Sequence, residues 1–308
     1  MSLAAKLLLT PLLIAQALQA RARLPRLPEA DGARSGVEGQ GLGRRPLHLL
    51  IAGDSSAAGV GVFSQQQALA GQLTSRLAAA GLEVHWHLVA RSGLTSAQTF
   101  ALLREAAETD LNRHFDYAVI VTGVNDVIDQ IPSHHAVAAR DALANWLRNR
   151  LGVMHVVFAP LPPVHRFPGL PQPLRWVAGR DAERHNRALD AWAATRSDVS
   201  RAAIDLELDT TSMAVDGFHP GTPVYRQCAA DIAHHILRQL AAAGWAIDIA
   251  EGHHAPEPEG QDAVRDRREP RHRPGHRQAG GGRRRQHRHR GQDHGAQPEA
   301  ARYAVQRR

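Results

Sequence analysis

Two hydrophobic patterns alternate along residues 46–245. Short, mostly apolar runs that end at Gly or a polar residue are typical of strands covered on both faces. Between them, apolar residues recur three and four positions apart, which predicts amphipathic helices. The expected strands are 47–52, 84–90, 117–122, 153–159 and 202–206, and the expected helices are 65–80, 96–107, 134–151, 180–195 and 222–243.

This alternation predicts the α/β fold class. Strands that alternate with helices form a parallel sheet with right-handed crossovers and helices on both faces. Ligand sites in such sheets lie at the carboxyl ends of the strands. Side chains that directly follow the expected strands are therefore the first candidates for chemistry.

The N-terminal segment carries an apolar run over residues 7–18, shorter than the ~20 residues of a membrane-spanning helix. The run fits a signal-peptide core with Ala15 and Ala17 at a cleavage site, or an amphipathic or docked N-terminal helix followed by a basic turn. Arg21, Arg23 and Arg26 favour an interfacial helix. We therefore expect weak membrane-surface association, and a cytoplasmic or inner-membrane-associated protein in preference to a secreted one. Residues 27–45, rich in Gly, Pro and charge, are expected to be a linker.

Charge is concentrated at the C-terminus. Of the formal net charge of +7, residues 251–308 carry +6, from 14 Arg and 8 acidic residues. This tail has one aromatic residue, Tyr303, and few aliphatics, so we expect it to be disordered. It either binds acidic lipid or nucleic acid or is a solvated extension without a role. The near-neutral remainder gives no reason to expect a specific nucleic-acid partner. The expected organisation is an N-terminal segment and linker (1–45), a globular α/β domain (46–245) and a basic tail (246–308).

Four segments carry candidate chemistry. Ser55 follows the first strand among small residues, Gly93 follows the second strand and Asn125 follows the third. Asp216 precedes His219 by three residues, a spacing at which a carboxylate can fix the imidazole tautomer. Each segment alone also fits an ordinary turn or helix cap. Their order, and their positions after strands or before the last helix, favour a shared site.

In the order GDSSAAGVG, Gly93, GVND and DGFHP, these segments resemble the SGNH hydrolase superfamily, also called GDSL esterases and lipases. The resemblance spans roughly residues 46–243. It implies a three-layer α/β/α, flavodoxin-like fold with a five-stranded parallel sheet. It also implies Ser55 as nucleophile, His219 as base and Asp216 as its orienting carboxylate. The implied oxyanion hole consists of the Ser55 and Gly93 N–H groups and the Asn125 amide.

The expected substrate is a small acyl ester or a lipid-like ester. The Pro-rich loop after the fourth strand offers Leu161, Val164 and Phe167, which either wall an acyl pocket or belong to an ordinary crossover loop. The chemistry requires no cofactor, and the expected domain lacks His and Cys at metal-ligand spacing. The alternatives are a thioesterase or carbohydrate deacetylase with the same triad, and a non-catalytic binding protein on the same fold.

Overall fold

A six-stranded sheet forms the centre of the computed structural model, which describes residues 3–111, 114–206 and 208–245. The strand order is β1-β3-β2-β4-β5-β6. Strands β2 to β6 run parallel, and only the edge strand β1 is antiparallel to its neighbour. The strands are β1 (Ser35–Glu38), β2 (Leu47–Gly53), β3 (Val84–Ala90), β4 (Tyr117–Val121), β5 (His155–Phe158) and β6 (Val199–Arg201).

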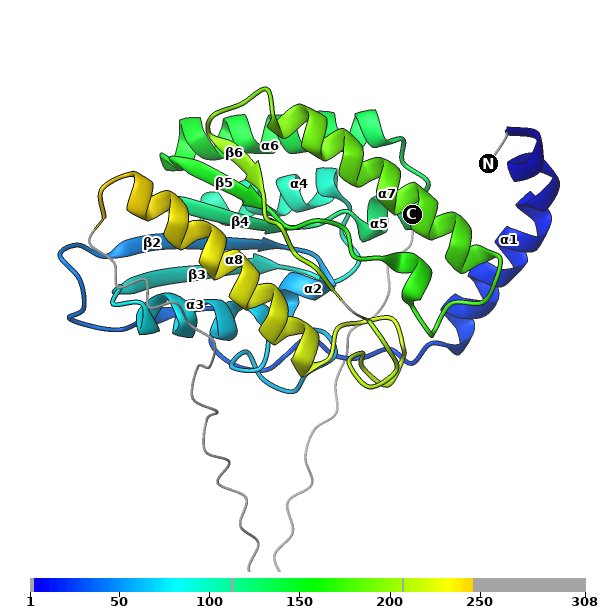
Figure 1. Ribbon diagram of the computed structural model, residues 1–308, viewed down its shortest axis with the longest axis horizontal. Coiled ribbons are helices and arrows are strands. Elements are labelled where there is room, and N and C mark those ends of the chain that lie inside the picture. The colour runs from blue at the N-terminus through cyan, green and yellow to red at the C-terminus, as the bar shows by residue number, and fades with distance from the viewer. Residues whose placement is uncertain (1–2, 112–113, 207, 246–308) are drawn as a thin grey trace, which may run out of the picture. The chain divides into compact units, whose positions relative to one another are not determined.

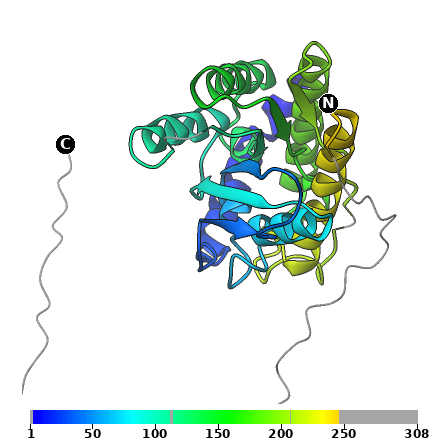
Figure 2. The same ribbon diagram turned by 90° about the vertical axis from the view of Figure 1, so that its left-hand side faces the viewer.

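Helices cover both faces of this sheet, as the views in Figures 1 and 2 show. On one face α3 and α8 enclose an apolar core with the sheet, and on the other α4, α6 and α7 enclose a second core. The helices are α1 (Leu3–Arg23), α2 (Ser55–Ala58), α3 (Leu69–Ala79), α4 (Ser96–Ala107), α5 (Val124–Ile128), α6 (Ser133–Leu151), α7 (Leu174–Ala193), α8 (Thr222–Ala242) and the 3-10 turn η1 (Val164–Arg166). The predicted three-layer α/β/α fold is confirmed.

The sheet differs from the predicted one at its two edges. Five strands were expected, and β1 adds a sixth from within the segment expected to be a linker. Gly36 lies opposite Trp86 of β3, and a Cβ at position 36 would lie only 3.1 Å from the indole Nε1 of Trp86. At the other edge, the strand expected at 202–206 is wrong, because β6 is Val199–Arg201. The basic tail lies outside the described residues, and the division into segments stays a prediction.

The three central strands end level with one another. Gly53 at the end of β2 is in register with Ala90 of β3 and with Val121 of β4. The residues that follow these strands therefore meet at one edge of the sheet, although they are far apart in the sequence. This edge faces the end of the molecule where α1 lies beside α7 (Figure 1).

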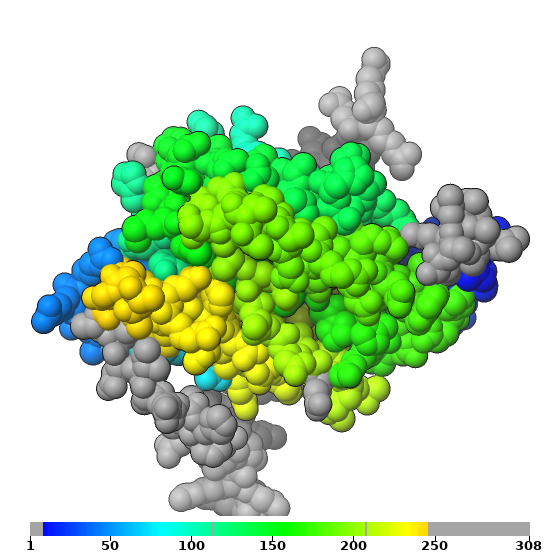
Figure 3. All heavy atoms as spheres, turned by 45° about the horizontal axis from the view of Figure 1, so that its top comes forward, coloured from blue at the N-terminus to red at the C-terminus, as the bar shows by residue number. Residues whose placement is uncertain are grey.

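Helix α1 lies outside the two layers that cover the sheet. In the space-filling view its blue atoms appear at one end of the molecule, next to the green surface of the segment around α7 (Figure 3). In the part of the chain that the structure describes, no helix combines the length and apolar character needed to cross a membrane.

Candidate active site

Ser55 is positioned by the tight connection between β2 and α2. A Cβ on Gly53 would overlap the carbonyl oxygen of Val121 on β4, so only glycine allows the two strands to lie this close. The Asp54 carboxylate then caps α2 by accepting a hydrogen bond from the Ser56 N–H at 3.0 Å. Ser55 is the first residue of α2, and its half-buried side chain borders a cavity.

Asp216 and His219 form a close pair in the loop before α8. The Asp216 Oδ2 lies 2.6 Å from the His219 Nδ1, and its Oδ1 accepts the N–H groups of Phe218 and His219 at 2.9 Å each. Burial alone would raise the pKa of Asp216, but these hydrogen bonds outweigh it and hold the pKa below its usual value. The carboxylate therefore stays charged, and His219 borders the same cavity as Ser55.

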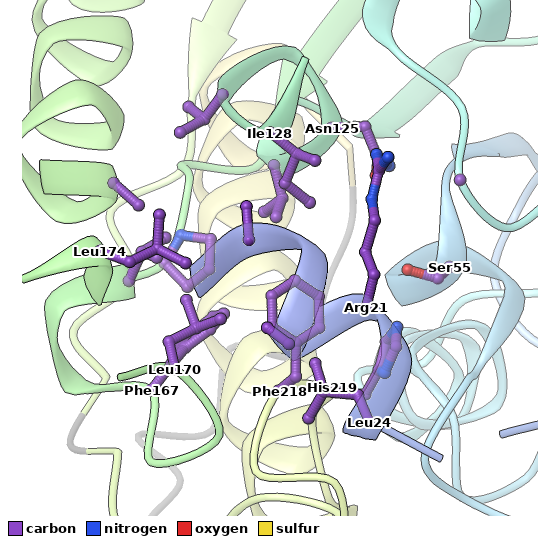
Figure 4. A pocket seen from close by; sticks show the side chains of 18 of the residues that line it. Arg21, Leu24, Ser55, Asn125, Ile128, Phe167, Leu170, Leu174, Phe218 and His219 are labelled. Atoms are coloured by element: carbon purple, nitrogen blue, oxygen red, sulfur yellow. The ribbon is translucent and has the colours of Figure 1, made fainter. Parts of the chain in front are cut away.

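Two candidate hydrogen-bond donors lie at the same end of this cavity: the backbone N–H of Gly93 and the side-chain amide of Asn125. Gly93 has a φ of 81° with open space at its missing Cβ, and it lines the cavity. The Asn125 Nδ2 donates to the Leu94 carbonyl at 3.0 Å and to the Asp54 Oδ2 at 3.3 Å. Figure 4 shows Ser55, Asn125 and His219 at one end of the pocket, with Phe167, Leu170 and Leu174 at the other.

A buried ion pair, Asp126 with Arg140, lies next to this edge of the sheet. Asp126 accepts hydrogen bonds from the Ser96 N–H at 2.9 Å and the Ser96 hydroxyl at 2.5 Å, and it pairs with Arg140 at 3.3 Å. Asp126 and Arg140 are both fully buried, so removing either one would leave an unpaired charge inside the protein. Arg140 also donates to the Thr122 carbonyl, which fixes the chain between β4 and α5, the short helix that carries Asn125.

Asp54, the residue before Ser55, is also buried. Burial raises the pKa of this carboxyl to about 7, even though the hydrogen bond from Ser56 and the neighbouring His219 both act to lower it. Within the described ranges, no three His, Cys, Asp or Glu side chains are grouped so that they could hold a metal ion.

A family model now identifies the chain. The GDSL-like lipase/acylhydrolase family matches residues 51–227, which include Ser55, Gly93, Asn125, Asp216 and His219. The chain belongs to the GDSL-like lipase/acylhydrolase family. It is therefore a carboxylic ester hydrolase by family, as the sequence motifs predicted.

Solved structures agree with this GDSL-like fold. Lip_vut3, a lipase from a goat rumen metagenome, has a TM-score of 0.51 at 17% identity, covering 61% of this chain and 96% of its own. A family 3 carbohydrate esterase from Clostridium thermocellum has a TM-score of 0.52 at 16% identity, covering 65% and 99%. No curated protein matches the sequence.

In this GDSL-like hydrolase, the predicted substrate loop is only partly at the cavity. Val164 and Phe167 line it, and Phe167 packs edge-on against Phe218, with ring centres 5.3 Å apart. Leu161 is buried beneath Gly123, with its backbone bonded on both sides to Asn186, and is not among the lining residues. The structure thus brings Val164 and Phe167, but not Leu161, to the cavity wall.

Sequence reasoning missed a contribution from the N-terminal segment of this hydrolase. Residues of α1 and the chain after it form a large part of the cavity lining. Glu29 accepts hydrogen bonds from the N–H and hydroxyl of Ser92, at 2.7 and 2.8 Å, and so holds the loop that presents Gly93. The spacing of Leu13, Ala17 and Ala20 places them on one side of a helix, but it does not show which part of the protein that side contacts.

Proposed function

We propose that this hydrolase cleaves acyl esters through a Ser55–His219–Asp216 triad and an acyl-enzyme. The observation that carries the proposal is the 2.6 Å contact between Asp216 and the His219 Nδ1, at the edge of the cavity that Ser55 also borders. With Nδ1 held by the carboxylate, the other ring nitrogen is the one free to act as a base. The proposed catalytic residues all come from the segment 46–245.

The proposed reaction has two matched halves. The Ser55 Oγ bonds to the ester carbonyl carbon as its proton passes to His219, and the oxyanion is held by the N–H groups of Ser55 and Gly93 and by the Asn125 amide. The carbon–oxygen bond to the alcohol then breaks, and the alcohol leaves with the proton from His219. Water repeats the sequence at the acyl-enzyme, releasing the acid and restoring the serine. These steps use only side chains and water, so they require no cofactor.

The test is hydrolysis of p-nitrophenyl esters from acetyl to palmitoyl by the wild type and by Ser55→Ala. Ser56→Ala is the matched control, because Ser56 is the adjacent hydroxyl and borders the same cavity. We expect Ser55→Ala to abolish turnover and Ser56→Ala to retain most of it. If Ser56→Ala lost activity and Ser55→Ala kept it, the nucleophile would be Ser56, and the assignment of Ser55 would be wrong. An acyl-CoA thioester and an acetylated sugar, run in parallel, separate an esterase from a thioesterase or a carbohydrate deacetylase.

We also propose that Val164 and Phe167 wall the acyl side of this cavity. Both are buried in an apolar cluster that includes Leu208 and Met213. Phe167→Ala would therefore enlarge the acyl side and change the ratio of activity on long and short esters. If the ratio of activity on long and short esters were unchanged, Val164 and Phe167 would belong to an ordinary crossover loop with no role in acyl binding.

Weak binding to an anionic membrane surface is the third part of the proposal. Leu12 and Leu18 are 46% and 61% exposed on α1, and Arg23 and Arg26 are exposed near its C-terminal end. The first acidic residue of the chain is Glu29, so every charged side chain of the helix is basic, which suits anionic lipid. We expect cosedimentation with vesicles containing phosphatidylglycerol, and loss of it in Leu12→Ser/Arg23→Gln. Equal binding by this variant would contradict the proposal.

A further inference from the structure

The cavity at the active site extends far beyond the residues that the chemistry needs. Its volume is about 960 Å³, at the upper end of the range for small-molecule sites. From Ser55 and His219 it continues past Phe167 to Leu174 and Val177 at the start of α7. Most side chains that line this extension are aliphatic or aromatic. An acetyl group would occupy only the first part of such a space.

Helix α1 forms one long wall of this extension. Leu13, Ala17, Ala20 and Leu24 all line the cavity, and they are spaced four, three and four residues apart, which places them on one side of the helix. These four are buried or half-buried, whereas Ala15 is exposed and does not line the cavity. With a rise of 1.5 Å per residue, the wall from Leu13 to Leu24 is ~16 Å long.

This wall runs from the reacting groups to the far end of the cavity. At its C-terminal end, Arg21 pairs at 3.6 Å with Asp129, the residue that directly follows α5, the helix that carries Asn125. Toward its N-terminal end, Gln16 donates to the Gln172 carbonyl at 2.7 Å and accepts from the Leu174 N–H at 3.1 Å. Figure 4 shows α1 passing across the pocket between these two ends.

Helix α1 and the chain after it are both attached to the rest of the domain. The chain after it is fixed by Glu29 at Ser92 and by Ala30, which is buried and bonded to the Ala58 carbonyl. On the helix itself, Gln16 bonds to Gln172 and Leu174 at the start of α7, and Arg21 makes an exposed ion pair with Asp129. The helix also lies outside residues 51–227, the segment matched by the family model. It is therefore an addition to the catalytic core that borders the substrate cavity.

We propose that α1 is the acyl-chain wall of the active site and that it makes long-chain esters the substrates of this enzyme. The inference rests on the proposed function of Ser55. An acyl group attached at Ser55 extends along Leu24 and Ala20 first, and only a long chain reaches Ala17 and Leu13. Each methylene that leaves water for this cavity raises kcat/KM by about fourfold, until the cavity is filled.

The test places a large side chain on each side of the helix. Ala17→Phe fills the far part of the cavity, and Ala15→Phe is the matched control on the exposed side. We expect Ala17→Phe to lower kcat/KM for the palmitoyl ester by about 15-fold relative to kcat/KM for the butyryl ester, the loss of two buried methylenes. Ala15→Phe should leave both values at the wild-type level. Equal palmitoyl-to-butyryl ratios in wild type and Ala17→Phe would overturn the proposal.

A binding measurement separates this inference from the proposed chemistry. In the inactive Ser55→Ala protein, palmitate should displace a bound fluorescent fatty acid, and the added Ala17→Phe change should weaken palmitate binding by about the same 15-fold. If no ester is hydrolysed but palmitate binds in this way, the proposed reaction fails and the acyl wall stands. If esters are hydrolysed but Ala17→Phe does not weaken palmitate binding, the proposed role of α1 is wrong and the proposed reaction stands.

Discussion

Replacing Asn125 with alanine tests the oxyanion hole at its only proposed side-chain donor. Both hydrogens of the Asn125 amide have partners in the resting enzyme, the Leu94 carbonyl at 3.0 Å and the Asp54 Oδ2 at 3.3 Å. The contact with Asp54 is longer than the usual range for an N–H···O bond, so it is the weaker of the two. We therefore expect the developing oxyanion to take over the hydrogen that faces Asp54.

The size of the effect follows from that exchange. One oxyanion-hole donor contributes roughly 2.7–4 kcal/mol to the transition state. Releasing the long bond to Asp54 costs about 1 kcal/mol, the usual net value of a hydrogen bond. The difference, ~2–3 kcal/mol, corresponds to a decrease in kcat of about 30- to 150-fold. Because the bond to the substrate strengthens only as charge develops, KM should change little.

Steady-state hydrolysis of a p-nitrophenyl ester gives kcat and KM separately for Asn125→Ala. Asn145→Ala is the matched control, since Asn145 is exposed on α6 and bonds to Asp141 and Arg196, away from the cavity. The control should keep wild-type kcat. A kcat for Asn125→Ala within threefold of wild type, or an effect confined to KM, would refute the assignment of this amide to the oxyanion.

Three other predictions concern charged groups. Asp216→Asn should lower kcat by about 10⁴-fold in the same assay, because an amide no longer fixes the reactive tautomer of His219. Since burial raises the Asp54 pKa from 3.8 to about 7, the folded protein keeps a proton there that the unfolded chain releases. The free energy of unfolding should thus fall as pH rises through that interval, and Asp54→Asn should flatten the decline in urea titrations at pH 5 and 8. Arg140→Met leaves the buried Asp126 charge unpaired and should cost ~3–5 kcal/mol in urea unfolding, against about 0–1 kcal/mol for an exposed arginine of the same helix.

The central sheet was predictable because its strands are encoded locally. Apolar runs marked β2, β3 and β4 to within a residue, and the residues after them proved to lie at one edge because the strands end in register. The edge strands were not predictable in this way. β1 lies in a Gly-rich, charged segment and exists through its pairing with β3, and β6 has only three residues.

Long-range contacts explain the other differences. Helix α7 begins at Leu174, six residues before the predicted start, and contains Gly179. Glycine disfavours a helix locally, but here a Cβ would collide with His165 of η1, so packing requires it. The wall formed by α1 depends on contacts such as Gln16 with Gln172, which lie 156 positions apart. No local pattern carries such information.

The inward side of α1 has a further consequence for how this enzyme can diversify. The groups proposed for bond cleavage are dispersed from Ser55 to His219, and each is constrained by the sheet or by its neighbours. The residues that border the extended cavity from α1 come from one short stretch that ends at Leu24. Under the proposed role of α1, changes between Leu13 and Leu24 alter which acyl chains fit without disturbing the bond-breaking groups, and exchanging that stretch between homologous enzymes would shift chain-length preference.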